Sequence, residues 1–216
     1  APAAVGVIGA GTMGAGIAQV AAAAGHRVYL TDARDGAAAA SRERIASTLA
    51  GLVAKGKLDA AAADATVARI QVVNSLAEMA DAALVVEAII EDLQAKQALM
   101  RELEQHLSEH AVLATNTSSI SVTAIANGMQ HPQRMVGMHF FNPVPLMKLV
   151  EVIRALTTSD ETYETVFAFA QSLGKEAITA PDRPGFIVNR LLVPYLLDAI
   201  RSYEHGLGTV EDIDKG

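Results

Sequence analysis

A glycine-rich turn near the start of the chain constrains its fold more than any other feature. The turn, GAGTMG at residues 9–14, follows the apolar run Val5–Ile8 and opens an alanine-rich apolar stretch. This order of strand, turn and helix is the fingerprint of a dinucleotide-binding βαβ unit. Gly9 permits the tight turn, Gly11 lets the backbone approach a pyrophosphate, and Gly14 allows the helix to pack closely on the strand. We therefore predict an α/β fold built around a Rossmann-type domain.

An acidic residue, Asp32, ends the second predicted strand eighteen residues after Gly14. The fingerprint places an acid about 20 residues beyond the glycines, where its carboxylate binds a ribose 2′-OH and repels a 2′-phosphate. NAD is therefore favoured over NADP as the cofactor. FAD uses the same kind of loop. Two plainer interpretations also stay open, Asp32 as the N-cap of the next helix and the glycines as ordinary turn residues.

Short β-branched runs alternate with longer alanine-rich stretches along most of the chain. This alternation is typical of βαβ units on a parallel sheet. Gly25 and Gly174 stand where the C-caps of two helices are expected. Strands are predicted over residues 5–8, 27–31, 70–73, 83–86, 112–114, 135–138 and 149–153, and helices over 13–24, 35–55, 59–68, 93–108 and 161–173.

Two prolines and a glycine within residues 180–185 mark a domain boundary. They interrupt the periodicity of the sequence, so residues 1–182 are predicted to form the NAD-binding Rossmann-type domain. Residues 183–216 are predicted to form the beginning of a C-terminal all-helical domain, with its first helix over 186–203. The apolar spacing of that helix requires packing partners. We therefore expect the sequence to be the front part of a longer polypeptide, or to lack its last domain.

The composition argues against several function classes. The formal net charge of −7 argues against a nucleic-acid-binding surface, and the absence of cysteine excludes thiol catalysis, disulfides and cysteine-ligated zinc. No apolar run reaches the roughly 18 residues of a membrane-spanning helix, and no set of His, Asp and Glu has the spacing of metal ligands. We expect a cytoplasmic protein, although a mature mitochondrial matrix protein would look the same because its leader is removed.

One histidine stands in a setting that favours proton transfer. His139 ends a predicted strand just before Asn142 and Pro143, and parallel sheets usually place ligands at such strand ends. Glu151 follows twelve residues later among apolar residues, where a carboxylate needs a partner. A turn at 143–145 would bring it beside His139, which would create a general base and a carboxylate that orients it. The plainer interpretations are a structural histidine and an edge-strand glutamate facing water.

Five stretches, in the same order, are shared with a known family. They are GAGTMGAGIAQ at 9–19, VVEAIIE at 85–91, TNTSSI at 115–120, HFFNPVPLMKLVE at 139–151 and PGFIVNRLLVP at 184–194. Over essentially its full length the chain resembles the L-3-hydroxyacyl-CoA dehydrogenases, including their 3-hydroxybutyryl-CoA members.

The resemblance implies a Rossmann-type domain followed by a helical domain that dimerises and closes the substrate cleft. It implies that His139 takes the 3-hydroxyl proton as general base and that Glu151 orients it. The other implied site residues are Ser118 and Asn189 at the 3-oxygen and the imidazole, Asp32, Glu91, Lys96, Asn142 and Ser118 on the NAD side, and Lys55 at the CoA nucleotide.

The implied reaction is the NAD-dependent oxidation of a short-chain L-3-hydroxyacyl-CoA to the 3-ketoacyl-CoA, and its reverse. Plainer interpretations remain for three residues: Ser118 as a helix cap, Asn189 in inter-domain packing, and Lys55 as a solvated helix-end lysine. Two rival functions keep the fold. One is a dehydrogenase of sugar acids such as gulonate, and the other is a non-catalytic NAD-binding or structural protein. The presence of both His139 and Glu151 argues against the second rival.

Overall fold

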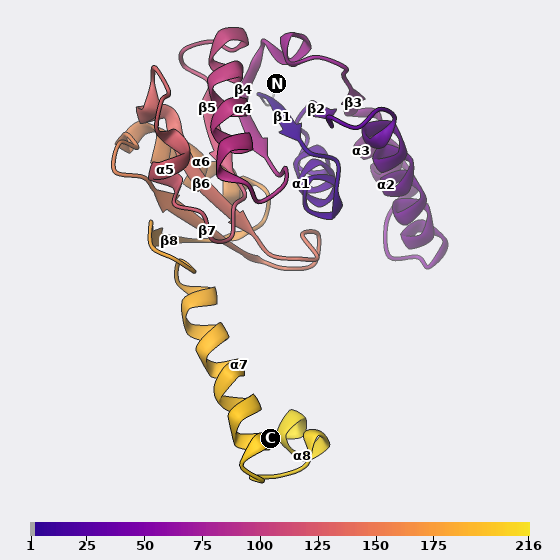
Figure 1. The fold of residues 1–216 in the computed structure, drawn as a ribbon. Helices are drawn as coiled ribbons and strands as arrows, with labels where there is room; N and C mark the ends of the chain where they lie inside the picture. Colours follow the sequence, from indigo (N-terminus) through magenta and orange to yellow (C-terminus); the bar gives the residue numbers. More distant parts are fainter. Residues whose placement is uncertain (1–2) are drawn as a thin grey trace.

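The computed structural model describes residues 3–216, which form one eight-stranded sheet with helices on both faces and a helical extension (Figure 1). The strands are β1 (Ala4–Ile8), β2 (Val28–Thr31), β3 (Ile70–Val72), β4 (Ala82–Glu87), β5 (Val112–Thr115), β6 (Met135–Phe140), β7 (Leu149–Arg154) and β8 (Glu176–Pro181). The α-helices are α1 (Thr12–Ala23), α2 (Ala37–Ala54), α3 (Ala60–Ala68), α4 (Leu93–His106), α5 (Val122–Ala126), α6 (Asp160–Ser172), α7 (Val188–Glu204) and α8 (Val210–Lys215), and two short 3-10 helices are η1 (Leu76–Met79) and η2 (Pro132–Arg134).

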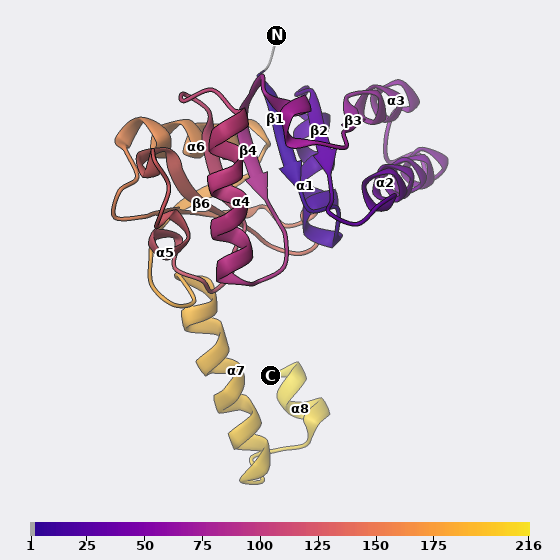
Figure 2. The same cartoon turned by 45° about the horizontal axis from the view of Figure 1, so that its top comes forward.

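The sheet has the order β3-β2-β1-β4-β5-β6-β7-β8, and its central strands are buried because helices cover both faces. Helices α1, α2, α3 and α6 share one apolar layer with the sheet, and α4 and α5 share the other. Along β1, Val5 and Val7 enter the first layer, whereas Ala4 and Ile8 enter the second. Figure 2 shows α4 running in front of the sheet. Burial on both sides explains why the strands read as unbroken apolar runs.

The alternation predicted from the sequence is confirmed for most of the sheet. The six strands β1 to β6 pair in parallel, and the predicted helices lie within two residues of the observed ones. Gly25 and Gly174 follow the C-caps of α1 and α6 with φ of 99° and 72°. Both glycines therefore terminate their helices in the left-handed conformation, as predicted.

One strand pair departs from the parallel pattern. β7 runs antiparallel to β6, so that His139 lies opposite Glu151 in the register. The predicted turn after β6 is therefore confirmed. β8, parallel to β7, was not predicted from the sequence, because most of its residues are exposed or half-buried and show no apolar alternation. Helix α5 was not predicted either, since five residues are too few for a helical period to emerge.

The chain leaves the sheet at β8 and continues into α7 and α8, which project away from the sheet domain (Figure 1). No residue of α7 is buried, and large apolar side chains such as Leu191 and Tyr195 are about 70% exposed. Within residues 3–216, no helix combines the length and apolar character needed to cross a membrane.

Candidate active site

The glycine-rich turn has the geometry of a nucleotide-binding loop. A Cβ on Gly14 would lie 1.7 Å from the carbonyl oxygen of Gly9, and Gly9 itself has a φ of 98°. By contrast, a Cβ on Gly11 would meet no atom within 4 Å. Gly9 and Gly14 are thus required by the turn and by the packing of α1. Gly11 keeps space open above the N-terminus of α1, where backbone N–H groups suit a pyrophosphate.

Asp32 lies at the end of β2 beside this loop. Its Oδ2 accepts a hydrogen bond from the Ala10 N–H at 2.7 Å, and its Oδ1 accepts one from the Arg34 N–H at 2.9 Å. Burial would raise the pKa of Asp32, but the hydrogen bonds from Arg34 and Ala10 outweigh it and hold the pKa below its usual range. The N-cap of α2 is Gly36, so the interpretation of Asp32 as the cap of that helix is wrong.

A cavity of about 620 Å³ opens between the ends of β1, β2 and β4. Its lining includes Gly9, Gly11, Asp32 and Arg34 from one side and Ile90 from the other. An ionised carboxylate in the wall and a glycine without a side chain at the floor fit the adenosine ribose and pyrophosphate of NAD. The residues present therefore fit the predicted cofactor.

His139 and Glu151 form a buried pair across the β6–β7 ladder. The His139 Nδ1 lies 2.8 Å from the Glu151 Oε2, and the side chains are 7% and 0% exposed. Burial would raise the pKa of Glu151, but its hydrogen bonds with His139 and with the backbone of Val188 and Ile187 outweigh it and lower the pKa. The carboxylate is ionised near neutral pH, so Nδ1 of His139 carries the ring proton and donates a hydrogen bond to Oε2. The second nitrogen, Nε2, is left as a proton acceptor.

The other oxygen of Glu151 binds the start of α7. Oε1 accepts hydrogen bonds from the N–H groups of Ile187 at 3.0 Å and Val188 at 2.9 Å. A helix N-terminus has N–H groups without intrahelical partners, and an anion there is stabilised by the helix dipole. Glu151 therefore joins His139 to the helix that begins the C-terminal extension. The alternative of an edge-strand glutamate facing water is wrong, because the side chain is fully buried.

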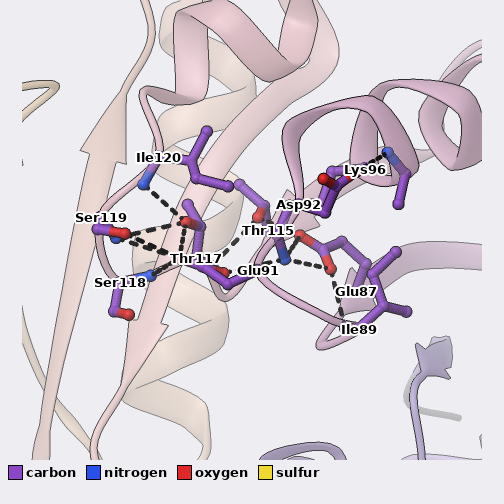
Figure 3. A network of polar contacts seen from close by, with 11 residues as sticks. Glu87, Ile89, Glu91, Asp92, Lys96, Thr115, Thr117, Ser118, Ser119 and Ile120 are labelled. Atoms are coloured by element: carbon purple, nitrogen blue, oxygen red, sulfur yellow. Dashed lines mark hydrogen bonds and ion pairs between the residues drawn. The ribbon is translucent and has the colours of Figure 1, made fainter.

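A second network connects β4 and α4 with the segment around Ser118 (Figure 3). The Lys96 Nζ lies 2.8 and 2.9 Å from the two carboxylate oxygens of Glu87 and 3.4 Å from the Glu91 Oε2. The Glu91 Oε1 accepts hydrogen bonds from the Thr117 hydroxyl and from the Ser118 N–H, the latter at 2.9 Å. Burial would raise the pKa of Glu91, but these bonds and the Lys96 charge lower it. Lys96 is 1% exposed, so in this structure it acts on the site through Glu91.

Ser118 and Asn189 line the same cavity, of about 590 Å³, between the sheet domain and the start of α7. Helix α5 takes its N-cap from Ser121, so Ser118 does not cap it. The Asn116 side-chain oxygen accepts a hydrogen bond from the Phe140 N–H at 2.9 Å. The serine segment is thereby held to the strand end that carries the histidine. The structure thus brings together the two polar side chains that the family resemblance places at the 3-oxygen of the substrate.

Comparison with known proteins agrees with this geometry. A family model described as the NAD binding domain of 3-hydroxyacyl-CoA dehydrogenase matches residues 4–183, and a model of the C-terminal domain of the same family matches residues 185–216. The chain belongs to the 3-hydroxyacyl-CoA dehydrogenase family. As a member of that family it is an NAD-dependent oxidoreductase, and residues 4–183 are its NAD-binding domain.

Curated and solved relatives place the chain well inside this family. It is 48% identical to the mitochondrial hydroxyacyl-coenzyme A dehydrogenase of Homo sapiens, over 96% of this chain and 68% of that protein. It is 43% identical to the 3-hydroxybutyryl-CoA dehydrogenase of Mycobacterium tuberculosis, over 98% and 74%. The crystal structure of (S)-3-hydroxybutyryl-CoA dehydrogenase from Ralstonia eutropha superimposes with a TM-score of 0.94 at 40% identity, over 98% of this chain and 75% of that one.

Two predicted site residues of this dehydrogenase do not line the cavity that contains Ser118 and Asn189. Asn142 follows β6 and lines a cavity of about 280 Å³ together with Arg44 and Thr48 of α2. Lys55 is the exposed C-cap of α2, two turns beyond Thr48, and lines none of the cavities described here. Its predicted contact with the CoA nucleotide stays a prediction.

Sequence reasoning assigned no role to several residues that build the site. Glu87 is fully buried as the partner of Lys96, and a carboxylate at the end of an otherwise apolar strand was a signal for it. Asn116 accepts the hydrogen bond from Phe140, and Phe186, whose ring centroid lies 5.5 Å from that of His139, precedes α7 although the sequence predicts that it begins that helix. Within residues 3–216 no group of three or more potential metal ligands occurs.

Proposed function

We propose that this dehydrogenase oxidises short-chain L-3-hydroxyacyl-CoA, such as 3-hydroxybutyryl-CoA, to the 3-ketoacyl-CoA, and catalyses the reverse reaction. The observation that carries the proposal is the buried His139–Glu151 pair with its 2.8 Å contact. Family membership and the identity to relatives named 3-hydroxybutyryl-CoA dehydrogenase favour a CoA thioester over a free sugar acid.

The proton transfer follows from the geometry of the pair. Because Nδ1 of His139 faces Glu151, Nε2 accepts the proton of the substrate 3-hydroxyl. NAD, when bound, would supply the acceptor for the hydride that leaves C3, the carbon that carries this hydroxyl. The ionised Glu151 stabilises the imidazolium that forms and holds the ring in one tautomer. In the reverse direction His139 returns its proton to the forming alkoxide.

The other residues bind and orient. We assign Ser118 and Asn189 to the 3-oxygen of the substrate, since they share one cavity. We assign Gly9, Gly11, Gly14 and Asp32 to the pyrophosphate and ribose of NAD, and Glu91, Lys96 and Asn142 to its nicotinamide side, with Lys96 acting through Glu91. Lys55 is assigned to the CoA nucleotide. We also propose a homodimer formed through the helical domain, in the cytoplasm or the mitochondrial matrix.

The decisive test is NADH oxidation with acetoacetyl-CoA, measured on the full-length polypeptide that contains this chain. His139→Gln should lower kcat roughly 10²–10⁴-fold, because the general base is lost. His110→Gln is the matched control: the His110 side chain is 89% exposed and lies beside the surface residue Glu109, so activity should be unchanged. The proposal fails if free 3-hydroxybutyrate or L-gulonate is oxidised as efficiently as the thioester, or if His139→Gln retains full activity.

A further inference from the structure

We infer that Phe186 is a positioning residue for the His139–Glu151 pair. Its left-handed backbone aims the N–H groups at the start of α7 toward Glu151, and its ring packs against the imidazole of His139. This inference rests on the proposed function for its kinetic consequence. Its structural part, the orientation of the pair, can be measured without any turnover.

The backbone of Phe186 is unusual. Its φ is 48°, and within residues 3–216 it is the one non-glycine residue with a positive φ. A bulky residue in this region is strained and persists only where the surrounding structure holds it there, commonly at functional sites. The preceding residue, Gly185, also has a positive φ, of 77°, which a glycine adopts without steric cost. Phe186 lacks that freedom, so the contacts of its backbone and side chain must offset the strain.

The turn is held at both ends. Before it, the Asp182 carboxylate accepts hydrogen bonds from the N–H groups of Val122 and Thr123 at 2.8 Å each, which ties the segment to α5. Within it, the Phe186 N–H donates to the Arg183 carbonyl at 2.9 Å. After it, the next two N–H groups bind Glu151. A residue between two such anchors has little freedom to choose another conformation.

The side chain completes the surroundings of the base. Phe186 is 1% exposed, and its ring meets the imidazole of His139 edge to face at a centroid distance of 5.5 Å. Phe141 lies on the imidazole as well, at 4.6 Å. The ring of His139 is thus confined by two phenyl groups while Nδ1 is fixed by Glu151. Loss of either restraint leaves more imidazole orientations, of which few are productive.

The two carboxylate oxygens of Glu151 have different hydrogen-bond partners. Oε1 is occupied by the N–H groups of Ile187 and Val188, and Oε2 by His139. If the turn at Phe186 relaxed, Oε1 would lose its donors and the carboxylate would be free to rotate away from Nδ1. Because misplacement by about 1 Å can cost roughly a hundredfold in rate, the effect should appear in kcat rather than in cofactor binding.

Two variants separate the backbone from the ring. Phe186→Val disfavours a positive φ and removes the ring, whereas Phe186→Gly accepts the turn and removes only the ring. The matched control is Phe169→Val: Phe169 is also a buried phenylalanine beside a histidine, His26, but it belongs to α6 on the opposite apolar layer. Each variant is measured for kcat with acetoacetyl-CoA, for NADH affinity, and for the low-field proton resonance of the Nδ1–H of His139 without substrate.

We expect Phe186→Val to lower kcat roughly ten- to a hundredfold, to change NADH affinity less than twofold, and to broaden or abolish the low-field resonance. Phe186→Gly should keep the resonance and lose less activity, and Phe169→Val should keep both. The inference is overturned if Phe186→Val keeps the resonance and matches the Phe169→Val control. If the glycine and valine variants lose the resonance equally, the part of the inference that concerns the backbone is overturned, because loss of the ring then accounts for the whole effect. If the wild type fails to turn over acetoacetyl-CoA, the proposed function fails, but the resonance still decides the positioning role.

Discussion

Replacement of Lys96 by methionine should destabilise the protein strongly although it removes no apolar contact. The Lys96 ammonium lies between Glu87 and Glu91 and is 1% exposed, and Glu87 is fully buried. Methionine fills a similar volume but leaves Glu87 as a buried carboxylate without a counter-charge. Breaking a buried ion pair in this way typically costs about 3–5 kcal/mol.

The structure places the expected cost at the lower end of that range. Glu87 keeps two donors, since its Oε2 accepts from the Ile89 N–H at 3.0 Å and its Oε1 from the Thr115 hydroxyl. We therefore expect about 3 kcal/mol for Lys96→Met. A domain of this size loses roughly 2–4 °C per kcal/mol, which corresponds to a fall in Tm of about 6–12 °C. The double variant Lys96→Met with Glu87→Gln removes both charges and should be more stable than Lys96→Met alone by about 1 kcal/mol or more.

Differential scanning calorimetry of the NADH-free protein measures these values. Lys57→Met serves as control, because Lys57 is exposed and surface substitutions change stability by less than about 0.5 kcal/mol. The reasoning is refuted if Lys96→Met melts within about 2 °C of the wild type, the shift expected for a surface substitution. It is also refuted if the effects of Lys96→Met and Glu87→Gln simply add, since the two groups would then be energetically independent.

Two further predictions concern the cofactor loop and the catalytic pair. Gly14→Ala should abolish NADH binding and destabilise the fold, because the added Cβ would lie 1.7 Å from the Gly9 carbonyl oxygen. The Cβ added by Gly11→Ala would meet open space, so this variant should fold normally and only bind NADH more weakly. Equal melting temperatures and equal NADH affinities of the two variants would contradict this prediction. Glu151→Gln should lower kcat and flatten the dependence of stability on pH. The lowered pKa of Glu151 stabilises the folded protein above the usual value of 4.5, and this stabilisation is lost as pH falls through the lower folded-state pKa. Urea unfolding is measured between about pH 3 and 7, roughly the range over which carboxylates titrate. The free energy of unfolding should fall less on acidification in Glu151→Gln than in the wild type. An unchanged dependence of the unfolding free energy on pH would count against the lowered pKa of Glu151.

The sequence alone determined the parts of the site that depend on spacing along the chain. The order of strand, glycine turn and helix located the cofactor loop, because the steric requirement for each glycine comes from the turn itself or from the adjoining strand and helix. The pairing of His139 with Glu151 was also within reach, since a turn between two neighbouring strands places residues opposite each other at a fixed separation. The helix ends at Gly25 and Gly174 followed from local backbone chemistry in the same way.

Only the tertiary structure decided which distant groups complete each buried charge. Glu151 needed donors for its second oxygen, and these come from residues 36 and 37 positions away at the start of α7. The position of Phe186 against His139 and the hydrogen bond from Phe140 to Asn116 likewise join segments that no periodicity relates. A sequence pattern shows that a buried carboxylate must have partners. A buried carboxylate has no water to bind, so its partners must be protein groups that the fold places beside it. The tertiary arrangement of strands and helices therefore decides which groups these are.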